Sequence, residues 1–226
     1  MATAPLGQTL CMLYPPTAPR RLFPPAAAAQ PLSRFSPPKG WFSMTAQNIL
    51  EYASRENLKA ALISPQDVPV NYKFRQFCEQ NLCGNYGTNY ACPPDCGTPE
   101  DLHQKLLAEE QVLIVQSVWE IIDYSDRPAV EHAKNTHNAA VRRLVQQLKA
   151  DGYDGFCAGY NGCHLCDVCN CTKQLPCVHP DLRIDCLSSY CVDVAELARR
   201  CNLEFAWSRT KLHLFGMIAL HKVSSR

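Results

Sequence analysis

The chain has 226 residues, of which 46% are hydrophobic, and this length is enough for one domain with a real core. Its 22 basic and 21 acidic side chains leave a net charge of +1, which gives no electrostatic case for binding nucleic acid or an anionic membrane. No apolar run approaches the ~18 to 20 residues of a membrane-spanning helix, so we expect a soluble protein.

Residues 1–43 differ in composition from everything after them. They contain nine prolines, an alanine run at Ala26–Ala29 and no acidic residue. We expect this stretch to be a disordered leader, because such a composition cannot form a packed core. Two interpretations stay open: an organellar targeting peptide, which is typically basic and poor in acids, or a start codon placed upstream of a true start at Met44. The cysteine-rich domain is then expected over residues 44–226.

The domain is predicted to begin with a helix from Thr45 to about Asn57, where apolar residues recur at helical spacing. A short strand over Ala60–Ile63 should follow. Prolines then interrupt the chain before Tyr72–Gln80, which is predicted to form a helical turn.

The stretch Cys78–Gly97 is predicted to be a loop, because glycine, asparagine and proline punctuate it. It contains a first group of four cysteines: Cys78, Cys83, Cys92 and Cys96. These thiols are candidate ligands of a second metal site, wrapped by the tight backbone that Gly84 and Gly87 allow. The alternative is that some of them only pack in the interior, since their spacing matches no standard metal template.

The middle of the chain is predicted to contain a helix from Thr98 to about Glu110, a strand over Gln111–Ile122, a long helix over Ala129–Ala150 and a short strand over Phe156–Ala158. Thr98 followed by proline is a typical helix start, and Asp126 or Ser125 can cap the long helix. The strand is rich in β-branched residues, and its continuous apolar start indicates a central position. His137 is expected at the surface or partly packed, because no metal-binding residue stands four positions away.

Five cysteines fall between Cys163 and Cys177. The spacing C-x2-C-x2-C lets one loop wrap a metal centre with three thiolates, and a later cysteine after a proline can supply the fourth. This pattern is typical of a cubane 4Fe-4S cluster. The candidate metal ligands are Cys163, Cys166, Cys169 and Cys177.

Alternatives to this cluster remain open. Seven residues rather than three separate Cys169 from Cys177, and Cys171 between them could compete as a ligand. A zinc site also uses Cys-x2-Cys pairs, and His164 and His179 are close in sequence. A disulfide knot is the third alternative, but the clustering of the 14 cysteines favours metal. Because no secretory leader is recognisable, we expect a reducing, cytoplasmic compartment.

The last part of the chain is predicted to hold one or two short helices, the second capped by Asp193, and a closing β-hairpin made of Glu204–Trp207 and Leu212–Leu220. Three isolated cysteines are interpreted as packing residues: Cys186, Cys191 and Cys201. The elements together predict a single α+β domain with a largely antiparallel sheet, helices on one face and two cysteine-rich metal-binding loops.

The chain carries, in this order, Cys83-Gly-Asn-Tyr-Gly, Cys92-Pro-Pro, Cys163-His-Leu-Cys166-Asp-Val-Cys169, Pro176-Cys177-Val-His-Pro180 and Val192-Asp-Val194. Over about residues 45–220 it thereby resembles a family of bacterial and archaeal proteins known only as predicted metal-binding proteins of unknown function. The resemblance implies metal binding in a prokaryotic cytoplasm and favours the four-cysteine ligand set, with Cys171 as an extra. It also implies that Cys186 and Cys191 replace a serine and a glycine that are usual in the family.

Two functions fit these motifs. The first is electron transfer to or from a redox partner protein through a 4Fe-4S cluster. The second is a binding module in which zinc or a cluster only stabilises the fold. Support for an enzyme is thin, because the chain has no phosphate-binding glycine loop, no Gly-x-Ser-x-Gly turn and no His-Glu-x-x-His helix. We therefore assign no catalytic residue, and the oligomeric state is not predicted.

Overall fold

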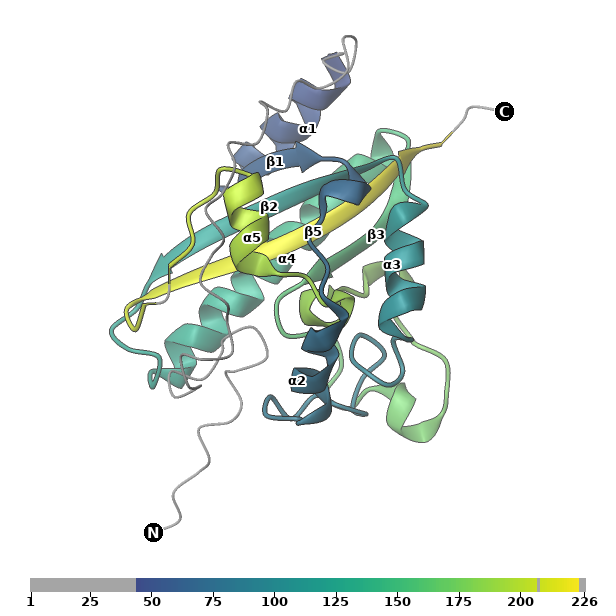
Figure 1. Ribbon diagram of the computed structural model, residues 1–226, viewed down its shortest axis with the longest axis vertical. Helices are drawn as coiled ribbons and strands as arrows, with labels where there is room; N and C mark the ends of the chain where they lie inside the picture. The colour runs from purple at the N-terminus through teal and green to yellow at the C-terminus, as the bar shows by residue number, and fades with distance from the viewer. Residues whose placement is uncertain (1–43, 207, 224–226) are drawn as a thin grey trace.

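The computed structural model describes residues 44–206 and 208–223, so the expected leader and Trp207 lie outside the described residues. Within them, one sheet has the strand order β1-β2-β5-β3-β4 (Figure 1). The strands are β1 (Lys59–Ile63), β2 (Gln111–Glu120), β3 (Tyr153–Gly159), β4 (Asp185–Cys186) and β5 (Lys211–Lys222). All pairs are antiparallel except the short pair of β3 with β4. The prediction of an α+β domain with a largely antiparallel sheet is confirmed.

Helices cover both faces of this sheet (Figure 1). The helices are α1 (Met44–Arg55), α2 (Arg75–Glu79), α3 (Pro99–Leu107), α4 (Arg127–Ala150) and α5 (Val194–Arg200). α1 and α4 pack on one face, and α3 and α5 pack on the other. The predicted caps Thr98, Asp126 and Asp193 each accept a hydrogen bond from a backbone N–H in the first turn of their helix.

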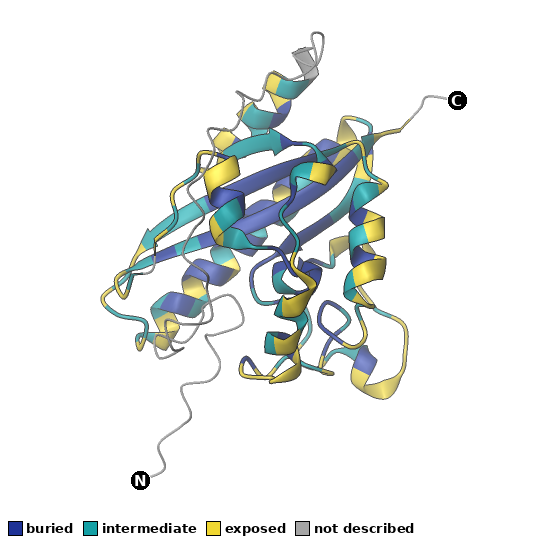
Figure 2. Ribbon diagram, viewed as in Figure 1, coloured by how far each residue is buried: buried dark blue, intermediate teal, exposed yellow. Residues whose placement is uncertain are grey.

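The expectation of helices on one face is wrong, and β2 shows why. The run Val112–Val115 is buried at every residue, with side chains alternating between the two cores. Ile114 faces the core under α3 and α5, while Leu113 faces the core under α1 and α4. A strand that is apolar on both sides needs a covering layer on each side. Figure 2 shows the buried residues concentrated on β2 and β5, between these layers.

The predicted closing hairpin is also wrong. Glu204–Ala206 form no strand, and β5 lies between β2 and β3 rather than folding back on a neighbour in sequence. Residues 214–220 of β5 are all buried. A strand this apolar is stable only in the middle of a sheet, where both edges and both faces are covered.

Both cysteine groups lie at one end of this sheet. The first group begins with Cys78 in α2 and continues in the loop after it, and the second lies in the loop that leaves β3 (Figure 1). Short 3-10 turns punctuate the connections: η2 (Pro65–Asp67), η3 (Tyr72–Phe74), η4 (Asn170–Lys173), η5 (Pro180–Leu182) and η6 (Leu187–Tyr190). No helix among the described residues has the length and apolar character needed to cross a membrane.

Among the glycines that the structure describes, Gly155 has the closest backbone neighbour. Its φ is +143°, and a Cβ there would lie 2.0 Å from the carbonyl oxygen of Ala219 on β5. We expect Gly155→Ala to lower the free energy of unfolding by about 2 to 4 kcal/mol, because β3 must move away from β5. Gly152→Ala is the control: its φ of +82° is also left-handed, but a Cβ meets nothing within 4 Å, so the cost should be about 1 to 2 kcal/mol. If urea unfolding gave equal decreases in the free energy of unfolding for the two variants, the close approach of β5 to Gly155 would not explain the cost.

His137 on α4 is fully buried, so the expectation that it lies at the surface or is only partly packed is wrong. Its Nδ1 lies 2.8 Å from the Ser117 hydroxyl. Burial lowers the pKa of His137 from 6.5 to about 4. Between pH 6.5 and pH 4 the unfolded chain therefore binds a proton here that the folded chain does not, and stability should fall as the pH falls, by up to about 3 kcal/mol. Urea unfolding across this range should show a shallower pH dependence in His137→Gln. Identical slopes in the two proteins would refute this assignment.

Candidate metal centre

The loop that carries the second cysteine group is held where it leaves β3. The buried Asn138 side chain on α4 accepts a hydrogen bond from the Tyr160 N–H at 3.1 Å and donates one to the Tyr160 carbonyl at 2.9 Å. A Cβ at Gly159 would lie 2.5 Å from the same amide oxygen, so only glycine fits there. The chain therefore enters the cysteine loop in a fixed direction.

The four candidate ligands share this loop, and each is half-buried. They are Cys163, Cys166, Cys169 and Cys177. Burial raises the pKa of Cys166, and the charges of the other three thiols raise it further, so each of these three lies within electrostatic range of Cys166. Two local bonds shape the loop between them: Thr172 donates to the Cys169 carbonyl at 2.9 Å, and Asn170 donates to the Pro176 carbonyl at 3.0 Å.

Cys169 and Cys171 have different electrostatic surroundings. Desolvation raises the pKa of Cys169, but hydrogen bonds from the backbone N–H groups of Cys171 and Tyr90 and from the Cys171 thiol outweigh it and leave the pKa lowered. Desolvation and this same thiol contact raise the pKa of Cys171 to about 11. Cys169 therefore loses its proton more readily than Cys171. Cys171 is a buried hydrogen-bond donor to the Cys169 sulfur.

The side chains do not converge on a single ion. Within residues 44–206 and 208–223, no three His, Cys, Asp or Glu side chains are grouped so that they could hold one. The zinc alternative would use His164 or His179, but both are exposed, and the His164 Nε2 lies 2.6 Å from the Asn161 carbonyl. Four sulfurs around one zinc stand only ~3.8 Å apart, given Zn–S bonds of ~2.3 Å. In a cubane each thiolate binds a different iron, so the sulfurs need not meet at one point.

The first cysteine group is split by the fold. Cys78, Cys83 and Cys92 are buried and line one small cavity. Cys96 is half-buried and is not among the residues that line this cavity; its sulfur lies 3.9 Å from the Arg75 guanidinium and 3.7 Å from the Gly97 carbonyl.

The two cysteine loops are locked together, although about 70 residues separate them in sequence. The Tyr90 hydroxyl donates to the Leu175 carbonyl at 2.6 Å, and the Asn85 amide donates to Asn161 at 3.1 Å. A Cβ at Gly162, where φ is +77°, would lie 3.0 Å from the Cys92 sulfur. The residue before Cys163 therefore touches the first cysteine group.

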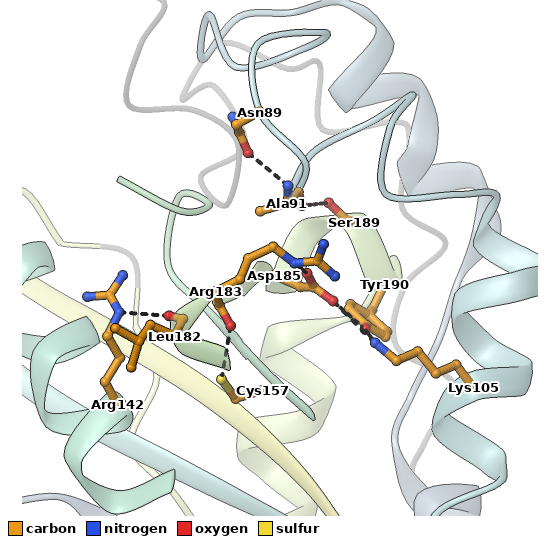
Figure 3. A network of polar contacts seen from close by, with 10 residues as sticks. All are labelled: Asn89, Ala91, Lys105, Arg142, Cys157, Leu182, Arg183, Asp185, Ser189 and Tyr190. Carbon is orange, nitrogen blue, oxygen red and sulfur yellow. Dashed lines mark hydrogen bonds and ion pairs between the residues drawn. The ribbon is translucent and has the colours of Figure 1, made fainter. Parts of the chain in front are cut away.

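A buried carboxylate on β4 joins α3 to the turn that follows β4, beside the cysteine loops (Figure 3). Asp185 on β4 is 4% exposed, and its Oδ2 accepts from the Tyr190 hydroxyl at 2.9 Å and lies 3.5 Å from the Lys105 ammonium. Its Oδ1 pairs with Arg183 at 3.1 Å. Desolvation, followed by this carboxylate, raises the pKa of Tyr190. Sequence reasoning missed this network, because nothing in the spacing of Lys105, Arg183 and Asp185 signals that they meet.

Fold and site together define a cysteine-rich α+β protein with thiols gathered in two adjoining loops. The chain belongs to the DUF2284 family, described as predicted metal-binding protein, whose family model matches residues 61–220. This confirms the family that the cysteine motifs resemble, and it supports metal binding without specifying the metal. Searches of curated proteins and of solved structures gave no match.

The Tyr90 hydroxyl is expected to anchor the second cysteine loop. In Tyr90→Phe the bond to the Leu175 carbonyl is lost, which should cost about 0.5 to 1.5 kcal/mol locally and speed amide exchange in residues 170–177 by up to about tenfold. Hydrogen–deuterium exchange with mass spectrometry measures this. Tyr72→Phe is the control, because it removes a hydroxyl bonded to His103 instead. Unchanged exchange in residues 170–177 of Tyr90→Phe would show that this bond does not anchor the loop.

Proposed function

We propose that Cys163, Cys166, Cys169 and Cys177 hold a 4Fe-4S cluster and that the protein transfers electrons to or from a partner protein in the cytoplasm. The observation that carries this proposal is the gathering of four half-buried thiols in one loop, closed on one side by the first cysteine loop. The donor set fits iron–sulfur chemistry, since it consists of thiols alone and the nearby histidines are exposed.

The hydrogen bonds at Cys169 support a redox site. Its sulfur accepts from the Tyr90 and Cys171 N–H groups and from the Cys171 thiol. Hydrogen bonds to ligand sulfurs are one of the means by which proteins adjust the potential of a cluster. When bound, a cubane cluster supplies a one-electron couple. Cys171 then acts as a donor to a ligand rather than as a ligand itself.

The surface around this loop supports a protein partner. Three apolar side chains next to the ligands are exposed: Val168 at 62%, Val178 at 59% and Leu175 at 50%. Exposed apolar groups that gather around a site are typical of surfaces that bind other proteins. Electron transfer needs such an approach, because the partner's redox centre must come close to the thiols.

The two cores on the faces of the sheet support a metal with a redox role rather than a metal that only stabilises the fold. Each core draws its side chains mainly from helices and from β2, β3 and β5, and none of the four ligands belongs to either. A structural metal contributes much of the folding free energy of a small domain. Here the apolar layers provide that energy, so the metal-free protein should stay folded.

Protein purified without oxygen is expected to be brown, with a broad absorption band near ~400 nm from thiolate-bound iron. Single substitutions of Cys163, Cys166, Cys169 or Cys177 by serine should abolish the band, because each removes a ligand. Cys171→Ser is the control and should keep the band while shifting the reduction potential. A paramagnetic signal after dithionite would report the reduced state. Colourless, folded protein with stoichiometric zinc would rule out the cluster.

The competing function is a protein-binding module stabilised by zinc or by a cluster without a redox role. The exposed valines and leucine near the ligands favour it as much as they favour a redox partner. Reducing and then removing the metal distinguishes the two functions. A centre that cannot be reduced, and whose removal unfolds both cores in circular dichroism, belongs to the binding module.

A further inference from the structure

We propose that a cavity beside β3 binds a small organic monocarboxylate, with Lys105 and Arg183 as the side chains that hold its carboxylate group. The cavity has a volume of about 440 Å³, which is within the range of sites that bind small molecules. The proposal does not rest on the cluster, because none of the four candidate cluster ligands lines this cavity.

The cavity exists because the strand at this edge of the sheet is short. β4 pairs only with Ala158 and Gly159 of β3. On the side of β3 that faces away from β5, no strand of the described chain therefore lies beside residues 153–157. Residues at the ends of α3 and α4 and in η5 form walls around this open edge. The apolar part of the lining is supplied by Val145, Phe156 and Pro180.

Two cationic side chains meet one buried carboxylate at one end of the cavity. The Lys105 Nζ lies 3.5 Å from the Asp185 Oδ2 and 4.0 Å from the centre of the Phe156 ring. The Arg183 Nε lies 3.1 Å from the Asp185 Oδ1, and Figure 3 shows Asp185 between the two cations. One carboxylate neutralises only one of them, so this end keeps a charge of +1. The side chains of Lys105 and Arg183 are 42% and 34% exposed, so a ligand can reach both.

The Cys157 thiol on the cavity wall experiences the same excess of positive charge. Its pKa is raised to about 12, first by burial and then by Asp185, whereas Arg142, Lys149 and Lys105 oppose this rise. Three cations and one carboxylate therefore act on this position. A net positive field at the wall of a cavity favours an anionic ligand.

The remaining charged side chains of the cavity largely neutralise one another. The His221 Nδ1 lies 2.7 Å from Glu109, whose hydrogen bond is the main cause that raises the pKa of His221. Lys149 lies 3.5 Å from Asp154. Asp181 is exposed, so water and salt screen its charge. The uncompensated charge is therefore the one beside Asp185.

These charges and walls define the class of ligand. A monocarboxylate carries the single negative charge that the Asp185 end of the cavity lacks, and the planar guanidinium of Arg183 matches its two oxygens. The apolar lining favours a ligand with a small apolar group behind the carboxylate. A phosphate dianion carries one charge too many and has no apolar part, so it fits less well.

Isothermal titration calorimetry of the full chain with benzoate, at constant ionic strength, tests this site. Benzoate should bind one to one, with a Kd of about 1 mM or below. Benzyl alcohol keeps the ring but lacks the charge, and inorganic phosphate is an anion without an apolar group. Each of these two compounds should bind at least roughly tenfold more weakly than benzoate.

A pair of variants locates the bound benzoate. Lys105→Met should weaken benzoate binding at least roughly tenfold, because it removes one of the two cations. Lys59→Met is the matched control: Lys59 also pairs with a carboxylate, that of Glu204 at 3.6 Å, but it lies on β1 at the opposite edge of the sheet. This control should leave the affinity for benzoate unchanged.

Acetylation mapping of the unaltered protein covers the case in which Lys105→Met does not fold. Saturating benzoate should slow the reaction of Lys105 with acetic anhydride several-fold, as measured by peptide mass spectrometry, while Lys59 reacts at its former rate. The proposal is overturned if benzoate does not bind, if benzyl alcohol or phosphate binds as tightly as benzoate, or if Lys59→Met weakens binding as much as Lys105→Met. An unchanged acetylation rate of Lys105 in saturating benzoate also overturns it.

Discussion

The pairing of β2 with β5 is the constraint on which the rest of the molecule depends. All ten residues of β2 pair with β5, and the run of apolar side chains on both strands requires a layer of helices on each face. β3 is then added to the far edge of β5. The cysteine loop that leaves β3 therefore begins from a rigid element, and Asn138 on the covering helix sets its direction.

The polar network around Asp185 holds β4, and with it Cys186, in a fixed position. Its carboxylate ties α3, through Lys105, to η6, through Tyr190, and β4 joins the edge of β3 beside it. A buried carboxylate with one partner removed is costly, so each of these contacts constrains the others. Cys186 follows Asp185 directly, and its place opposite Cys92 results from the same network. The arrangement of the thiols thus depends on groups that ligate nothing.

Sequence patterns predicted the local structure well where one short-range rule decides it. The caps Thr98, Asp126 and Asp193 and the strand beginning at Gln111 depend on neighbouring residues, and they lie where expected. The partners of β5 could not be predicted, because an apolar run does not specify which strands flank it. Cys186 could not be separated from an ordinary packing residue for the same reason: its contact with Cys92 is set by pairing between β3 and β4, far from Cys92 in sequence.

The contact between the two cysteine groups couples their positions. Gly162 packs against the Cys92 sulfur, and Cys163 is the next residue. A Cβ at Gly162 would lie 3.0 Å from that sulfur, which is tighter than an ordinary contact, so a displacement of Cys92 acts on the start of the second cysteine loop. The packing of Cys92 in the first group therefore also constrains the position of Cys163. The buried group thus preorganises the start of the half-buried one.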